Sequence, residues 1–470
     1  IGADNATQTF SLNANIDATI FDFSDDSAGR ITFAAGYTNP TTVELGLDGG
    51  TDSITNGGAL NANIDLTVTA LDADAFTSDT TVVGGTGTDT ISITSFATGG
   101  TANLTATSYI DVVNVIDYIN GADVTLTLGT NGAVSTPLTI NATSLDAGED
   151  LTVSGGNSLG SLTINAGAGA DGLTGGTVND IIDGGAGIDT IDGKENSATL
   201  GADNISGGAG NDIINVSTAE TEFSNSSTTA LVTDTVDGGA GTDTLAFAIA
   251  ATLTKAELGN ISNIETLSLA NTSTITLSDE FLLANPGVSI TLAAGTINAG
   301  AGTTADPTLT EAVSYTAGSG DINITTGTGD DSFNTSSATL INSTDTINGG
   351  AGTDTINVFN EATFGTTDTT GDAVTLALDI YHTNIEKVVV VDAGIDDSAG
   401  DVTITIAAAF AGTALEIDGT ALDQNALTAA NNESLTLTQA TADTAAITLT
   451  SGACADIITS VSYTHLTLPT

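Results

Sequence analysis

Three nine-residue units follow one another without a gap: AGAGADGLT at 166–174, GGTVNDIID at 175–183 and GGAGIDTID at 184–192. After a five-residue insertion the frame resumes as ATLGADNIS at 198–206 and GGAGNDIIN at 207–215. Each unit has an Asp at its sixth position and an apolar residue at its eighth. Self-similarity at a short fixed period is the signature of stacked repeats. The stretch 166–215 therefore predicts a coil of short strands joined by glycine-rich loops.

The glycines and the Asp of each unit have separate roles. Glycines permit positive φ and a close approach of backbone carbonyls, while the Asp supplies a carboxylate at the same place in every unit. The three residues after the Asp can form a strand whose middle side chain points inward. These inward residues are Leu173, Ile182, Ile191, Ile205 and Ile214. Tight hairpin turns are the alternative, since Gly-Gly before Asp also suits them.

The units resemble the repeats-in-toxin (RTX) nonapeptide, whose pattern GGxGxDxUx describes a calcium-binding β-helix repeat. The resemblance implies that alternate loops share one edge of the coil and hold calcium between them through Asp carboxylates and loop carbonyls. Asp171 and Asp189 would lie on one edge, and Asp180 on the other. Further copies occur at 84–92, 238–246 and 349–357. The predicted metal-ligating residues are Asp89, Asp171, Asp180, Asp189, Asp203, Asp212, Asp234, Asp243, Asp331, Asp345 and Asp354, with Gly184, Gly185, Gly187, Gly207, Gly208 and Gly210.

A longer repeat links the isolated loops to a later strand that begins with Ile and an acid. The spacing from loop Asp to strand acid is 22 residues both for Asp89 and Asp111 and for Asp243 and Glu265. The three return segments are SYIDVVNV at 108–115, SNIETLSL at 262–269 and TNIEKVVV at 383–390. This arrangement is similar to that of bacterial surface-layer proteins that carry RTX loops.

Between the loops, Thr alternates with Ile, Leu or Val, as half-buried strands require. We predict an all-β fold: a β-solenoid or β-roll with calcium loops, flanked by β-sandwich or β-helix modules. Short helical turns are expected at 254–259 and 278–284. The expected parts are N-terminal β modules at 1–165, the roll at 166–246, C-terminal β modules at 247–460, and a non-native tail at 461–470 that contains SYTHLTLPT, which resembles a translated sequencing adapter.

The charge of the chain excludes one class of partner. The 470 residues include 58 Asp and Glu but 4 Lys and Arg, giving a formal charge of −54. Nucleic-acid binding needs clustered basic residues, so we exclude it. A compact acidic chain repels itself unless cations lie among its carboxylates, and calcium is the hard cation abundant outside cells. Solubility or a saline habitat is the alternative reason for the acidity. No apolar stretch approaches the ~20 residues of a transmembrane helix.

Catalytic residue sets are missing from the sequence. A zinc protease needs two His on one helix, and the chain has only His382 and His465. The phrase GNSLG at 156–160 matches the GxSxG of lipases, with Ser158 as nucleophile, but no helical pattern follows it. The paired carboxylates of Asp330 and Asp331 could suit a glycosidase, but a chain without Trp lacks the aromatic platforms on which sugars stack. The pair therefore indicates calcium ligands or a solvated turn. We expect no enzymatic activity.

These observations predict a calcium-stabilised structural protein of a bacterial cell surface. It would be a surface-layer subunit or a self-assembling filament, with further copies of itself as partner and an extracellular location. Two alternatives stay open: a calcium-dependent adhesin that binds surface polysaccharide or cells, and a non-catalytic region of a secreted enzyme.

Overall fold

A computed structural model describes most of the strands and loops named above. The described residues are 8–12, 20–23, 29–33, 41–45, 53–56, 66–70, 76, 81–84, 87–94, 100–117, 122–131, 137–156, 158–193, 202–216, 234–248, 250–270, 272–292, 295–298, 312–317, 320–335, 341, 343–359, 374–391, 401–407, 410, 414–420, 434–440, 446–451, 457–460 and 466–467. The chain forms two compact units, residues 1–246 with 260–264, and residues 247–259 with 265–470.

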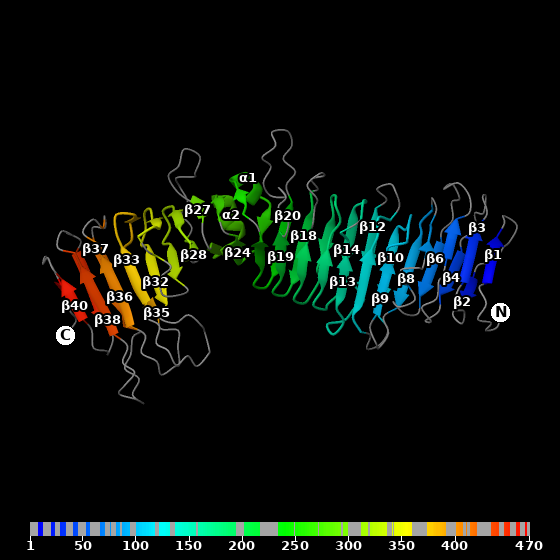
Figure 1. Ribbon diagram of the computed structural model, residues 1–470, viewed down its shortest axis with the longest axis horizontal. Helices are drawn as coiled ribbons and strands as arrows, with labels where there is room; N and C mark the ends of the chain where they lie inside the picture. Colours follow the sequence, from blue (N-terminus) through cyan, green and yellow to red (C-terminus); the bar gives the residue numbers. More distant parts are fainter. Residues whose placement is uncertain are drawn as a thin grey trace, which may run out of the picture. The chain divides into compact units, whose positions relative to one another are not determined.

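The first unit is a β-solenoid in which successive strands alternate between sheets (Figure 1). One full turn of the chain around the solenoid is called a coil below. One sheet has the order β2 (Ile20–Phe23), β4 (Thr41–Leu45), β6 (Leu66–Ala70), β8 (Thr90–Thr94), β10 (Val112–Ile116), β12 (Leu138–Asn141), β14 (Leu162–Asn165), β16 (Ile181–Asp183), β18 (Asn204–Ala209), β20 (Thr235–Ala240) and β23 (Ile261–Ser262). The opposite strands are β9 (Gly100–Leu104), β11 (Val124–Leu128), β13 (Leu151–Ser154), β15 (Gly172–Thr174), β17 (Thr190–Asp192), β19 (Ile213–Val216) and β21 (Thr244–Phe247). A further sheet has the order β1 (Gln8–Leu12), β3 (Gly29–Phe33), β5 (Ser53–Asn56) and β7 (Thr81–Val82).

The second unit repeats this plan. Its first set of strands is β24 (Thr266–Leu269), β26 (Ser289–Leu292), β28 (Ser314–Ala317), β30 (Ser332–Thr335), β32 (Thr355–Phe359), β35 (Lys387–Val391), β37 (Ala414–Gly419), β39 (Ala446–Ser451) and β41 (Leu466–Thr467). A second sheet has the order β22 (Thr252–Leu253), β25 (Ser273–Thr276), β27 (Gly295–Asn298), β29 (Ile322–Thr325), β31 (Thr346–Asn348) and β34 (His382–Thr383). The third sheet has the order β33 (Val374–Leu378), β36 (Asp401–Ile406), β38 (Ser434–Gln439) and β40 (Ile457–Ser460).

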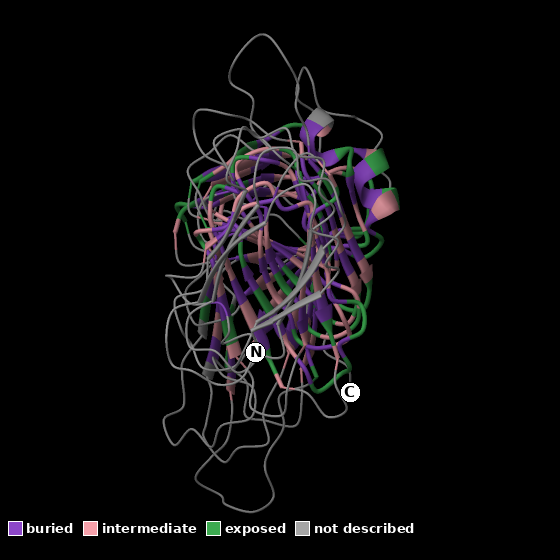
Figure 2. Ribbon diagram, turned by 90° about the vertical axis from the view of Figure 1, so that its right-hand side faces the viewer, coloured by how far each residue is buried: buried purple, intermediate pink, exposed green. Residues whose placement is uncertain are grey.

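The core of each coil is a set of apolar rows that run from strand to strand. Burial alternates along the strands because successive side chains point to opposite faces (Figure 2). In one row of the first unit Ile164, Ile182, Ile205 and Val236 are in register, and all four are buried. The five inward residues predicted from the repeats are buried in the same way. Each such side chain contributes about 1.5–3 kcal/mol when fully buried.

Insertions in the chain do not disturb this register. Ile182 still faces Ile205 across the five-residue insertion, and Ile205 faces Val236 across a longer segment. The rows of the core therefore continue across both insertions.

The all-β solenoid prediction is confirmed, and of the two predicted kinds of flanking module the β-helix is the one observed. The strand pairs whose registers are defined are parallel both before and after the repeats. A β-sandwich is built from antiparallel sheets, so that alternative is wrong for these segments. The boundaries of the four predicted parts stay a prediction.

Two short helices occupy the predicted helical turns. α1 (Lys255–Leu258) follows a capping box formed by Thr254 and Glu257, and α2 (Asp279–Ala284) is capped by Ser278, whose side chain accepts the Phe281 N–H. Within α2, the side chain of Phe281 is buried. No helix within the described segments is long and apolar enough to cross a membrane.

Candidate metal centres along the loop stack

Aspartates form a ladder along one edge of the first unit. The backbone N–H of Asp171 donates to Asp189 Oδ1, that of Asp189 to Asp212 Oδ1, and that of Asp212 to Asp243 Oδ1, each at 2.8 Å. The ladder starts at Leu151, whose N–H donates to Asp171 Oδ1 at 2.6 Å. All four Asp side chains are buried. Each carboxylate thus joins its own coil to the preceding one.

A second ladder runs along the other edge. Asp180 N–H donates to Asp203 Oδ1 at 2.7 Å, and Asp203 N–H donates to Asp234 Oδ1 at 2.8 Å. This ladder starts at Leu162, whose N–H donates to Asp180 Oδ1. The structure therefore places Asp171 and Asp189 on one edge and Asp180 on the other.

The second unit has two shorter ladders. Val313 N–H donates to Asp331 Oδ1 at 2.8 Å, and Asp331 N–H donates to Asp354 Oδ1 at 2.9 Å. On the other edge Ile322 N–H donates to Asp345 Oδ1 at 3.0 Å. All the predicted Asp residues of this unit are buried.

The glycines bring backbone carbonyls against these carboxylates. Gly185 has φ +92° and Gly187 φ +137°, which L side chains rarely adopt. A Cβ on either residue would overlap the carbonyl of Gly167 or Gly169 in the preceding loop. Successive loops are therefore stacked so closely that only glycine fits, and their carbonyl oxygens lie beside the Asp ladder. Gly208 and Gly210 repeat these contacts one coil further on, against the carbonyls of Gly185 and Gly187. Gly184 and Gly207 instead lie against Oδ2 of Asp189 and Asp212, respectively, and against a carbonyl of the following loop.

One carboxylate oxygen of several ladder residues has no hydrogen-bond donor. This is true of Oδ2 in Asp189, Asp212, Asp331 and Asp354, and each of these atoms is buried. A buried carboxylate oxygen without a donor is costly unless a cation or a proton neutralises it. His382 pairs with Asp379, and Lys387 pairs with Glu416 and Asp418, so neither of these two side chains neutralises the four atoms.

The pKa values show the same excess of negative charge. Burial, together with the charges of Asp171 and Asp212, raises the pKa of Asp189 to about 7. Burial and the charge of Asp331 raise the pKa of Asp354 to about 7. Burial also raises the pKa of Asp180 to about 6.

The donor set fits calcium. Carboxylate and carbonyl oxygens at a flexible, stacked edge are the hard ligands that this ion prefers. Within the described segments no three acidic, His or Cys side chains converge on one point, so each site would combine carboxylates with loop carbonyls.

Four segments of the chain match the model of the RTX calcium-binding nonapeptide repeat, at 163–191, 197–217, 233–246 and 342–358. These segments are RTX repeats. RTX repeats bind calcium, so Ca²⁺ is the ion of this chain, and proteins with RTX repeats are generally secreted or extracellular. Neither the curated proteins nor the solved structures gave a match.

Nine of the eleven predicted Asp ligands lie within the RTX matches, and the others are Asp89 and Asp331. Asp331 belongs to the ladder of the second unit. Asp89 is buried, and its N–H donates to Asp111 Oδ2 at 2.8 Å. Both residues therefore share the geometry of the RTX ladders.

Asp111 and Glu386 were missed as site residues by the sequence analysis. Each carboxylate accepts the N–H of a loop Asp one coil earlier, Asp89 for Asp111 and Asp354 for Glu386. The recurring Ile-acid pair marked both positions in the sequence. Their role depends on the register between coils, which the sequence alone does not give.

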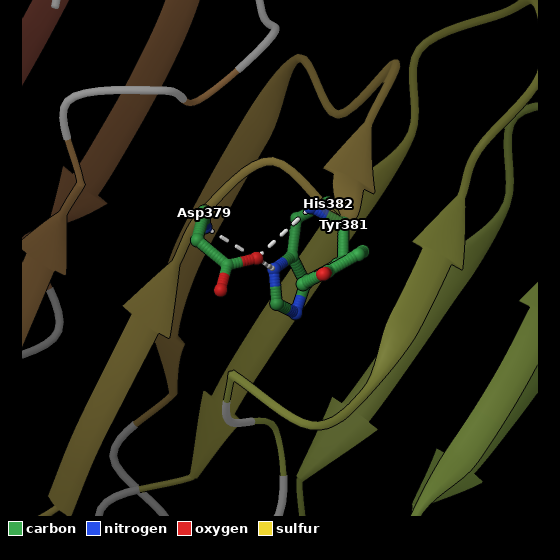
Figure 3. A network of polar contacts seen from close by, with 3 residues as sticks. All are labelled: Asp379, Tyr381 and His382. Carbon is green, nitrogen blue, oxygen red and sulfur yellow. Dashed lines mark hydrogen bonds and ion pairs between the residues drawn. The ribbon is translucent and has the colours of Figure 1, made fainter.

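Ser158 and His382, the residues considered for catalysis, form hydrogen bonds with residues close to them in the sequence. Ser158 is buried, and its hydroxyl donates to the Gly160 carbonyl at 3.1 Å. His382 is buried at the start of β34, with its Nδ1 3.1 Å from Asp379 Oδ1 (Figure 3). Burial lowers the pKa of His382. His465 lies outside the described residues.

We predict that calcium-free protein loses stability as the pH rises from about 4 to about 7. The folded pKa values of Asp180, Asp189 and Asp354 lie above the unfolded value of about 3.9, so the folded state binds more protons in this window. The stability is fully present below the unfolded pKa and is lost as the pH passes the folded pKa. Refolding with the osmolyte TMAO in chelator, compared at pH 5 and pH 8, measures the effect. Greater stability at pH 8 would contradict it.

Proposed function

We propose that the chain is a calcium-stabilised structural protein of a bacterial cell surface, which assembles with copies of itself into a layer or filament and has no enzymatic activity. The observation that supports this best is the set of buried Asp ladders on both edges of the coil. A scaffold whose edges consist of ion sites is folded where calcium is abundant. Proteins with RTX repeats are generally secreted or extracellular, which supports a location outside the cell for this chain.

Calcium provides a switch between compartments in this proposal. Extracellular calcium modules bind at about 10⁻⁴ to 10⁻³ M, far above the free concentration in the cytosol. Without the ion, the stacked carboxylates repel one another and the coil is destabilised. With the ion, binding energy becomes folding energy. The chain would stay unfolded for export and fold on reaching the outside.

Outward carboxylates support assembly between copies. Asp183 is exposed, Asp192 and Asp237 are half-buried, and all three lie on strands that directly follow a ladder Asp. Acidic side chains on two copies repel one another unless a cation lies between them. Calcium would therefore stabilise the contacts between copies as well as the fold.

Electron microscopy of the purified chain with calcium and with chelator tests this proposal. We expect ordered sheets or fibres with millimolar calcium and none with chelator. Particles that stay monomeric in both conditions would contradict assembly. A chain that stays monomeric but binds polysaccharide in calcium would be an adhesin.

A further inference from the structure

Three short turns share an unusual backbone conformation and one sequence pattern. Tyr109, Asn263 and Asn384 have φ of 58°, 54° and 53°, a region that non-glycine residues seldom occupy. Each is followed by a buried Ile and then by an acid: Ile110 and Asp111, Ile264 and Glu265, Ile385 and Glu386. We refer to these as the return turns. The 384–386 turn lies outside the RTX matches.

The return turn at 384–386 lies directly on the RTX loop 349–354. Gly349 N–H donates to the Thr383 carbonyl at 3.0 Å. The Asp354 carbonyl accepts the N–H groups of Glu386 at 3.1 Å and Lys387 at 3.0 Å. In return, Asp354 N–H donates to Glu386 Oε2 at 3.0 Å. Loop and turn are thus joined at both ends.

The return turn at 109–111 repeats these contacts on the loop that ends at Asp89. Gly84 N–H donates to the Ser108 carbonyl at 2.9 Å. The Asp89 carbonyl accepts the N–H groups of Asp111 at 3.0 Å and Val112 at 3.1 Å. The agreement between two distant segments shows that the geometry belongs to the sequence pattern.

A return turn replaces the next glycine loop of the stack. Within the repeats, the Gly207 carbonyl lies against Gly184, and Asp212 Oδ1 accepts the Asp189 N–H. At the return turn, the Asn384 carbonyl lies against Gly349, and Glu386 supplies the carboxylate. Three residues therefore provide the carbonyl and the carboxylate that a full RTX loop provides elsewhere.

The junction brings a carboxylate oxygen and a carbonyl oxygen close together. Asp354 is fully buried, and its Oδ2 has no hydrogen-bond donor. A Cβ built on Gly349 would meet both Asp354 Oδ2 and the Asn384 carbonyl oxygen, so these two oxygens lie against the same point. The carboxylate of Glu386 is one hydrogen bond away from Asp354, because its Oε2 accepts the Asp354 N–H at 3.0 Å. Oxygens that converge without a donor between them are suited to a hard divalent cation.

We propose that the return turns complete calcium sites at the ends of loop stacks, Asn384 and Glu386 with loop 349–354, and Tyr109 and Asp111 with Gly84 and Asp89. The proposal rests on the calcium-stabilised fold of the preceding section. It adds ligands that the nonapeptide motif does not contain. It also gives the recurring Ile-acid pattern a chemical role.

Hydrogen–deuterium exchange of the full chain, with and without 1 mM calcium, tests the proposal on the variant Glu386→Gln. The amide keeps an acceptor for the Asp354 N–H and removes the charge. In the wild type, calcium should slow exchange at 349–359 and 382–391 at least tenfold. In E386Q that protection should fall about tenfold at 1 mM calcium and return at higher calcium, while residues 184–216 stay protected. The exposed acid Glu280 gives the control variant E280Q, which should behave as the wild type.

The possible results separate the two proposals. Equal calcium protection at 349–359 in E386Q and wild type would overturn the role of the return turn and leave the calcium-stabilised fold in place. If calcium protects neither 184–216 nor 349–359 in the wild type, the calcium-stabilised fold itself fails. If E386Q does not fold, Asp111→Asn provides the same comparison at 87–94 and 109–116, and unchanged protection there would overturn the proposal.

Discussion

The variant Asp189→Asn should have opposite effects on stability in the presence and in the absence of calcium. In chelator it should be more stable than the wild type by about 2 kcal/mol, because an amide removes a buried charge whose pKa is raised to about 7. In millimolar calcium it should be less stable by about 1–3 kcal/mol, since a carboxylate ligand is lost. Because we expect the wild type to be unfolded in chelator at this pH, stability there is measured by refolding with the osmolyte TMAO, and stability in calcium by chemical denaturation, both at pH 8.

The choice of Asn keeps the hydrogen bond of the ladder. Its Oδ1 still accepts the Asp171 N–H, so a change in stability reports charge and ion binding. The exposed Asp146 lies in the same unit and gives the matched control Asp146→Asn, whose stability should change by less than about 0.5 kcal/mol in either condition. A D189N variant that is less stable to the same extent with and without calcium would show that the Asp has a purely structural role.

Removing calcium should unfold most of the RTX region at neutral pH. Asp189 and Asp212 are neighbours in one ladder, and the Oδ2 atom of each is buried without a hydrogen-bond donor. Without a cation, these stacked charges oppose burial of the apolar rows formed by Ile191 and Ile214. Structural metal sites couple binding to folding, so loss of the ions removes a free energy comparable to the net free energy of unfolding of a domain. We therefore expect loss of β structure, and not only local loosening of the loops.

The solenoid over 166–215 could be predicted from the sequence because its period is short and regular. The sixth-position Asp and the eighth-position apolar residue fix both the ladder and the inward row, as Asp189 and Ile191 illustrate. The insertions do not obscure the nine-residue period, because the frame resumes after each of them.

The flanking coils could not be distinguished from a sandwich in the same way. Strands such as β11 and β13 alternate Thr with Leu or Val, which suits parallel and antiparallel sheets equally. Their pairing, Val124 with Leu151, spans a connection without an RTX loop, so no motif marks the coil. The parallel register is decided by contacts between coils.

The ends of the ladders were also hidden in the sequence. At one edge the position of the ladder Asp is taken by Leu162, and the N–H of this residue caps the first carboxylate. In the second unit, the ladder of Asp331 and Asp354 ends at Glu386, whose carboxylate takes the place of the next ladder Asp. Both roles depend on which residues lie one coil apart, and variable connections remove any fixed spacing from the sequence.

The central claim is that calcium ions neutralise the Asp ladders and thereby hold the coil together. Far-ultraviolet circular dichroism during a calcium titration of chelated protein at pH 7.5 tests it most directly. We predict a cooperative gain of β structure with a midpoint at about 10⁻⁴ to 10⁻³ M, reversed by chelator and not reproduced by the same concentration of magnesium. A spectrum with full β structure in chelator, unchanged by calcium, would contradict the claim.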